Sequence, residues 1–71
     1  MSGQRCVIER RWEGRRAHYR AVAGPELVAR SLGFDPGDAG ADLAALDHLG
    51  RVLRALRWRP VEGSGRSYER R

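Results

Sequence analysis

Arginine is the residue type in this sequence with the clearest chemistry, and it gathers around one glycine-rich turn. The final stretch, "RVLRALRWRPVEGSGRSYERR", holds seven arginines against two glutamates. A guanidinium group matches phosphate oxygens with two parallel hydrogen bonds, and a glycine backbone can approach a sugar-phosphate strand closely. We therefore expect a nucleic-acid contact surface built by Arg51, Arg54, Arg57, Arg59, Ser64, Arg66, Arg70 and Arg71.

A second basic group crowds the first third of the chain and consists of Arg10, Arg11, Arg15, Arg16 and Arg20. If this segment forms a hairpin, Arg11 and Arg16 lie opposite each other on neighbouring strands and repel. A polyanion or an acidic partner surface would relieve that repulsion. Protection of an exposed strand edge against aggregation explains the same residues equally well, so both explanations stay open.

Charge is divided unevenly along the chain. All fourteen basic residues are arginine, and the formal net charge is +5. Residues 1–24 hold six arginines and two acidic residues, a net charge of +4. Residues 25–50 hold one arginine and five acidic residues, a net charge of −4, and residues 51–71 hold seven arginines and two acidic residues, a net charge of +5. This division predicts a polarised molecule, with basic ends and an acidic middle that faces elsewhere.

The sequence argues against catalysis and against a bound metal or cofactor. The segment "GSGRS" lacks the Gly-Lys-Ser/Thr ending of a phosphate-binding loop, and no nucleophile stands beside a base and an orienting acid. The single cysteine, Cys6, excludes an internal disulfide, and we expect it to be a small buried residue on a strand. Both histidines lack partners at metal-ligand spacing. We therefore expect no enzyme, no catalytic residue, no metal and no cofactor.

Aromatic side chains offer faces on which unpaired bases could stack, and the candidates are Trp12, Tyr19, Trp58 and Tyr68. Packing in the core is the favoured role, most of all for Trp58 at a junction between a helix and a strand. The sequence therefore allows RNA binding, but nothing in it requires RNA.

A small α+β domain must position these side chains. At 71 residues the chain is one domain, 1–71, and buries only about 60% of the surface that its unfolded form exposes. Residues 5–23 predict a β-hairpin, because β-branched and aromatic residues flank Glu13-Gly14. A register that sets Ile8 opposite Tyr19 gives this hairpin one apolar and one charged face.

Two helices are predicted in the middle of the chain. Residues 25–34 begin with Pro25, which suits a first helical position. Residues 42–57 begin at Asp42 as N-cap and carry an apolar stripe at spacings of three and four, made of Leu46, Leu49, Val52, Leu53 and Leu56. We expect this second helix to run unbroken through Gly50.

Residues 58–70 predict two short strands around the glycine-rich turn. Pro60 cannot donate a hydrogen bond to a neighbouring strand, so its strand lies at a sheet edge or is short. The order of elements is then hairpin, helix, helix, hairpin.

The pattern "LVARSLGF...LGRVLRALRW......GRSYERR" resembles the small winged-helix module at the C-terminal end of phage and plasmid primase-helicases, the virulence-associated E-like group. In that family an apolar helix ends in a Leu-Gly pair, here Leu32-Gly33, and a second apolar helix precedes a Trp and a Gly-Arg-x-aromatic strand. The resemblance covers about residues 26–70. It implies a helix-turn-helix with 42–57 as the DNA-recognition helix and 58–70 as the wing.

Together these features predict a small basic nucleic-acid-binding protein with duplex DNA as the expected partner, and the resemblance places it in phage or mobile-element replication or regulation. The alternative is a protein-interaction module, such as a phage-type inhibitor or adaptor, whose arginine faces dock on an acidic partner. Pairing of exposed hairpin edges leaves a homodimer open. No apolar run has the length of a membrane span, and the first residues lack the apolar core of a signal peptide, so we expect a cytoplasmic protein with no membrane partner.

Overall fold

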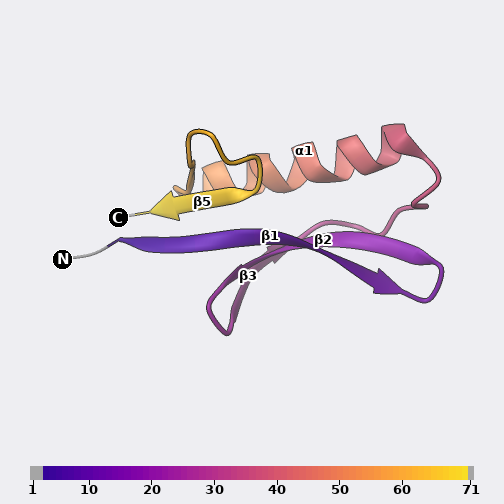
Figure 1. Ribbon diagram of the computed structural model, residues 1–71, viewed down its shortest axis with the longest axis horizontal. Coiled ribbons are helices and arrows are strands. Elements are labelled where there is room, and N and C mark those ends of the chain that lie inside the picture. The colour runs from indigo at the N-terminus through magenta and orange to yellow at the C-terminus, as the bar shows by residue number, and fades with distance from the viewer. Residues whose placement is uncertain (1–2, 71) are drawn as a thin grey trace.

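Five antiparallel strands and one helix make up the part of the chain that the computed structural model describes, residues 3–70. The strands are β1 Gln4–Glu13, β2 Arg16–Ala23, β3 Glu26–Arg30, β4 Arg59–Pro60 and β5 Ser67–Arg70, and the helix is α1 Ala39–Ala55. The strands form one sheet in the order β3-β2-β1-β5-β4, and α1 lies along one side of it (Figure 1).

The long strand β1 joins two hairpins into one sheet. Its residues 7–13 pair with β2, and its residues 4–7 pair with β5. At the outer end of the second pairing, Gln4 lies opposite Arg70. The beginning of β1 and the end of β5 therefore lie side by side at one end of the molecule (Figure 1).

The expected β1–β2 hairpin is present, with a register two residues away from the expected one. A two-residue loop that begins at Gly14 separates the paired residues Glu13 and Arg16. Gly14 has φ +61, which fits the first central position of a type II′ turn. Ile8 lies opposite Ala21. A shift of two keeps each side chain on its face, so the division into an apolar and a charged face holds.

The prediction of a helix over 25–34 is wrong, because Glu26–Arg30 forms strand β3. A second two-residue loop, Gly24-Pro25, precedes this strand, and Gly24 has φ +62. Pro25 cannot adopt a positive φ, so this loop is also a type II′ turn and returns the chain along β2. Val28 then packs against the core. Pairing with the open edge of β2 outweighs the helix propensity of the segment.

Helix α1 lies close to the expected 42–57, but it begins and ends earlier. Its N-cap is Asp38, whose carboxylate accepts a hydrogen bond from a backbone N–H of the first turn at 3.1 Å. The helix runs unbroken through Gly50, as expected. Leu49 and Leu53 of the apolar stripe are fully buried and fix the helix on the sheet.

The winged-helix and helix-turn-helix prediction is wrong for the described residues. α1 has no second helix beside it there, and the expected wing, 58–70, is a short hairpin that belongs to the main sheet through β5. Pro60 lies in the edge strand β4, which is two residues long, as its missing N–H predicts. The turn between the strands needs glycine for its own geometry, since Gly63 has φ +83 and the N–H of Ser64 donates to the carbonyl of Val61 at 3.1 Å.

The core lies between α1 and one face of the sheet. Its largest fully buried side chains are Trp58, Leu49, Leu53 and Cys6. Burial raises the pKa of the Cys6 thiol, which favours the protonated form, as suits a small buried residue on a strand. Charged side chains occupy the other face, which we call the open face because no helix among the described residues covers it. None of the described helical residues form a segment long and apolar enough to cross a bilayer.

Candidate nucleic-acid interface

Five arginines gather at the end of the molecule where β1 begins and α1 ends. We call this set the basic end, and its members are Arg5, Arg54, Arg57, Arg59 and Arg70. Strands β1, β4 and β5 contribute one arginine each, Arg54 lies in the last turn of α1, and Arg57 follows the C-cap of that helix. This is the end at left in Figure 1, where the labels N and C meet. Glu69 is a carboxylate that lies among these arginines.

Arg70 is held in one orientation by contacts on three sides. Its Nε and Nη2 donate to Oε1 of Gln4 at 3.0 and 2.8 Å. Its Nη1 donates to the carbonyl of Leu56 at 3.4 Å, and its guanidinium carbon lies 4.5 Å from the ring centroid of Trp58. Arg70 is therefore a fixed guanidinium rather than a mobile arm.

Arg57 ends the helix in a left-handed conformation, with φ +71. Its N–H donates to the carbonyl of Arg54 at 3.0 Å, and the N–H of Trp58 donates to the carbonyl of Leu53 at 2.9 Å. These two bonds form a Schellman motif, in which glycine is favoured at the position of Arg57. Replacement of Arg57 by glycine therefore removes a charge without straining the fold.

Other predicted residues of the last third lie away from the basic end. Arg51 pairs with Asp47 one helical turn earlier, with Nε 3.1 Å from Oδ2. Arg66 lies over a buried tyrosine ring, 5.7 Å from its centroid. Ser64 is half-buried in the turn before β5, and Arg71 lies outside the described residues. The structure thus brings part of the predicted set together and leaves the rest apart.

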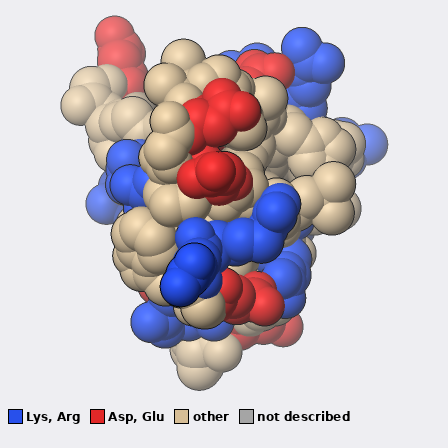
Figure 2. Space-filling model, turned by 90° about the vertical axis from the view of Figure 1, so that its right-hand side faces the viewer, with Lys and Arg blue, Asp and Glu red and all other residues tan. Residues whose placement is uncertain are grey.

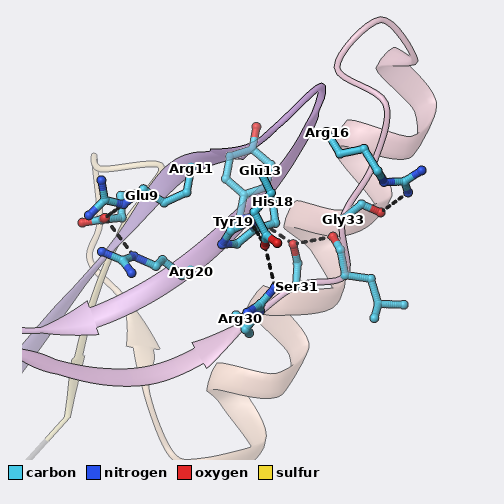
Figure 3. A network of polar contacts seen from close by, with 11 residues as sticks. Glu9, Arg11, Glu13, Arg16, His18, Tyr19, Arg20, Arg30, Ser31 and Gly33 are labelled. Atoms are coloured by element: carbon cyan, nitrogen blue, oxygen red, sulfur yellow. Dashed lines mark hydrogen bonds and ion pairs between the residues drawn. The ribbon is translucent and has the colours of Figure 1, made fainter.

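Arginines of the first hairpin are mostly bound by acceptors of the same molecule (Figure 3). Arg11 and Arg20 share the carboxylate of Glu9, at 2.6 and 2.9 Å. Arg16 donates to a backbone carbonyl in the segment after β3 at 2.8 Å. Arg11 lies opposite His18, so the expected repulsion between Arg11 and Arg16 does not arise.

Asp42 lies inside α1 rather than at its N-cap, and it ties the helix to the sheet. It accepts hydrogen bonds from Nη2 of Arg10, at 3.2 Å, and from the hydroxyl of Tyr19. Burial of the phenol and this carboxylate both raise the pKa of Tyr19. Arg10 therefore has a structural partner, and its charge is balanced within the molecule.

Two glutamates of β1 that were not singled out from the sequence pair with basic side chains on the open face. Glu9 holds the two arginines named above, and Glu13 lies 2.9 Å from Nη2 of Arg30. Nδ1 of His18 is 3.1 Å from the same Glu13 oxygen, but it is not aligned for a hydrogen bond. Alternation along β1 places both glutamates on one face, and this pattern could have identified them.

Glu9 makes the stability of the fold sensitive to acid. The hydrogen bond from Arg20, followed by the charges of Arg11 and Arg20, lowers the pKa of Glu9 below its usual value near 4.5. The stabilisation is therefore present above about pH 4.5 and is lost as the pH falls through the lowered pKa. We expect the urea midpoint of the wild type to fall more between pH 6 and pH 3 than that of Glu9→Gln. An equal fall in both proteins would show that this carboxylate does not contribute.

The two ends of the molecule differ in charge along its long axis, which measures 42 Å against 22 and 20 Å for the other two. Figure 2 views the end opposite the basic end, with the β1–β2 turn and the start of α1, and there basic and acidic side chains interleave. Arg15 lies in that turn, and the N-cap Asp38 lies at the start of the helix. The molecule is therefore polarised, but with one basic end rather than the two that the sequence predicted.

Aromatic side chains are not available for base stacking at the basic end. Trp58 and Tyr19 are 2% exposed and Tyr68 is 9% exposed, which confirms the core role. Trp12 is 60% exposed, but it lies near the β1–β2 turn at the opposite end. Contacts of the basic end are therefore restricted to hydrogen bonds and charge.

No protein-family model, curated protein or solved structure matches the chain. The winged-helix arrangement implied by the resemblance to virulence-associated E-like primase-helicases is also not the arrangement of the described residues. We therefore base the proposed function on the basic end alone.

Proposed function

We propose that this chain is a nucleic-acid-binding protein without enzymatic activity, which contacts the phosphates of duplex DNA through the basic end. One observation carries the proposal. None of the five arginines of the basic end forms an ion pair with a carboxylate of residues 3–70.

The contrast with the remaining arginines is what makes the basic end informative. Five of the eight other described arginines lie within ion-pair distance of a carboxylate, namely Arg10, Arg11, Arg20, Arg30 and Arg51. Of the other three, Arg16 donates to a backbone carbonyl, Arg66 lies over a tyrosine ring, and Arg15 lies in the β1–β2 turn. Like charges that are close together destabilise a fold, and a bound polyanion offsets that repulsion. The five unpaired guanidiniums gathered at the basic end therefore favour a partner of dense negative charge.

Duplex DNA fits this surface better than a single strand. Single-strand binding combines a basic groove with aromatic stacking, and the aromatic residues near the basic end are buried. The duplex carries one negative charge per about 1.7 Å of axis, so it presents several phosphates to a compact group of guanidiniums. Because phosphate contacts carry no sequence information, we expect weak sequence preference.

Substitution of Arg54 and Arg57, two arginines of the basic end that do not include the fixed Arg70, tests the proposal. We expect Arg54→Gln with Arg57→Gly to weaken binding to a random-sequence duplex at least about tenfold, because charge-assisted hydrogen bonds contribute about 1.5–3 kcal/mol each. If four of the five arginines contact phosphates, Arg54 and Arg57 among them, the slope of log K against log salt is about −3.6 for the wild type, and the variant should lose about half of it. Fluorescence anisotropy at several salt concentrations measures both quantities.

A matched control removes the same charge from the opposite end. Arg15→Gln with Arg16→Gln changes the net charge by the same amount and should leave the salt slope unchanged. Equal losses in both double variants would mean that overall charge, not the basic end, governs binding. No binding of any nucleic acid at moderate salt would sink the proposal.

A second candidate function, a protein-interaction module, is favoured by apolar side chains on the surface. Leu32 is 83% exposed and Leu43 is 68% exposed. A cleft of about 270 Å³ lies between the segment after β3 and α1 and is lined mainly by apolar groups, including Leu32, Phe34, Ala41, Ala44 and Ala45. A protein partner held there would bind with little dependence on salt, which separates this function from DNA binding.

Both edges of the sheet carry features that oppose a homodimer formed by strand pairing. The β2–β3 pairing shifts register between Ala21 and Val22, which marks a bulge beside the edge strand β3. The other edge strand, β4, contains Pro60 and has two residues. Bulges, prolines and short strands protect edges from pairing, so we propose that the monomer is the binding unit.

A further inference from the structure

A notch of about 440 Å³ opens in the basic end, where β1 begins and β5 ends. Three of its lining residues are arginines from three neighbouring strands, and the full lining is Gly3, Gln4, Arg5, Arg59, Glu69 and Arg70. Its volume is within the range of small-ligand sites, about 300–1,000 Å³. Because it is lined by polar and charged groups, its ligand must also be polar and must be anionic.

Strand register explains how the notch gathers its charge. Glu69 of β5 is paired with Arg5 on one side and with Arg59 on the other, so the three residues form one row across the sheet. Glu69 makes no ion pair within 4.0 Å among the described residues. Arg70 follows Glu69 in β5, so its side chain lies on the opposite face of the sheet and borders the notch from the side of Trp58. Counted together, the three arginines and one glutamate that line the notch leave an excess of two positive charges.

Arg70 gives the notch one donor whose orientation is set before any ligand arrives. The hydrogen bonds to Gln4 and Leu56 use three of the five guanidinium N–H groups, and the guanidinium plane stacks on Trp58. Two N–H groups remain without an acceptor among the described residues. A donor that is already fixed loses little conformational freedom when an anion binds.

We propose that this notch binds the terminal phosphate of a nucleic-acid strand, an inference that rests on the proposed function and names the part of the ligand that enters the site. A terminal phosphate monoester carries about −1.5 to −2 charges at pH 7, close to the excess of two in the notch, whereas an internal phosphodiester carries one. It also ends the strand, so it can enter a concave site, while an internal phosphate has a nucleotide on each side. Guanidinium groups bind such oxygens through short charge-assisted hydrogen bonds.

The test compares short duplexes of one sequence whose ends carry a 5′-phosphate, a 3′-phosphate or only hydroxyl groups. Anisotropy at 0.15 M salt should show that at least one phosphate-ended duplex binds about tenfold more tightly than the hydroxyl-ended one. The two phosphate arms identify which end the notch takes. Equal affinity for all three duplexes would overturn the proposal that the notch binds a terminal phosphate, but it would not contradict DNA binding by the basic end.

Two double variants test whether the preference for a phosphate-ended duplex arises in the notch. Arg5→Gln with Arg59→Gln should lower both affinities and reduce the ratio between phosphate-ended and hydroxyl-ended duplexes to about one. Arg54→Gln with Arg57→Gly removes the same charge outside the notch lining, so it should weaken both duplexes but keep the tenfold ratio. A ratio that persists in the first variant or disappears in the second would contradict the assignment. Circular dichroism of each variant confirms that the fold is intact.

Discussion

Replacing Trp58 with alanine is expected to destabilise the protein by about 3–5 kcal/mol. The indole is 2% exposed and is the largest of the fully buried side chains. It packs in the core with Leu49 and Leu53, and its outer face supports the guanidinium of Arg70. The whole stability of a small domain is only about 5 kcal/mol, so the Trp58→Ala protein should keep at most about 2 kcal/mol, and up to about half of it should be unfolded at room temperature.

Urea denaturation followed by circular dichroism checks this result, and the chain contains its own control. Trp12 is 60% exposed, so Trp12→Ala should shift the midpoint far less than Trp58→Ala. Trp58→Phe should be milder than Trp58→Ala, because Nε1 of Trp58 has no hydrogen-bond acceptor among the described residues. Similar shifts for Trp12→Ala and Trp58→Ala would show that the core is not built around this indole.

Gly50→Ala is the second substitution with a large expected effect on stability, and the sign of that effect depends on the hydroxyl group of Tyr68. A Cβ added at Gly50 would lie 2.9 Å from the hydroxyl oxygen of Tyr68, which is closer than packed atoms allow. Overpacking costs about 1–3 kcal/mol, and the better helix propensity of alanine returns up to about 1 kcal/mol. We therefore expect Gly50→Ala to lower the free energy of unfolding by about 1–2 kcal/mol.

The same substitution should become favourable once the hydroxyl is gone. In a Tyr68→Phe background, Gly50→Ala should raise the free energy of unfolding by up to about 1 kcal/mol, and the double-mutant cycle measures the difference. Gly40→Ala is the matched control, because a Cβ there meets its nearest neighbour at an ordinary 3.4 Å. If Gly50→Ala behaved alike in both backgrounds, contact with the Tyr68 hydroxyl would not be the reason for glycine.

Local signals in the sequence were sufficient for the elements that depend on neighbouring residues. The apolar stripe of Leu49 and Leu53 predicts α1, and alternation along β1 predicts which face is buried, even though the register of the hairpin was two residues off. The misplaced element is β3, because "ELVAR" has helical propensity and becomes a strand only beside β2. Gly24-Pro25 was the available signal, since glycine followed by proline satisfies a type II′ turn.

The candidate site was harder to predict, because it depends on which strands become neighbours. Arg5 belongs to neither predicted group of arginines, yet it shares a notch with Arg59 and Arg70 through the pairing of β1 with β5. Charge counts along the chain also could not show that Glu9 would pair with both Arg11 and Arg20, because the pair with Arg20 requires the β1–β2 register. Composition thus indicated a basic surface, and only the tertiary pairing located it.

The double pairing of β1 has a consequence for how the chain matures during synthesis. Residues 4–7 of β1 pair with residues 67–70 of β5, so contacts between residues that are far apart in the sequence must form before the sheet is complete. Such long-range contacts slow folding. On the ribosome, the meander β1–β2–β3 emerges first and keeps part of β1 unpaired until translation of β5 is over. We therefore infer that the native sheet is completed only once β5 has left the ribosome, with α1 and β5 added after the meander.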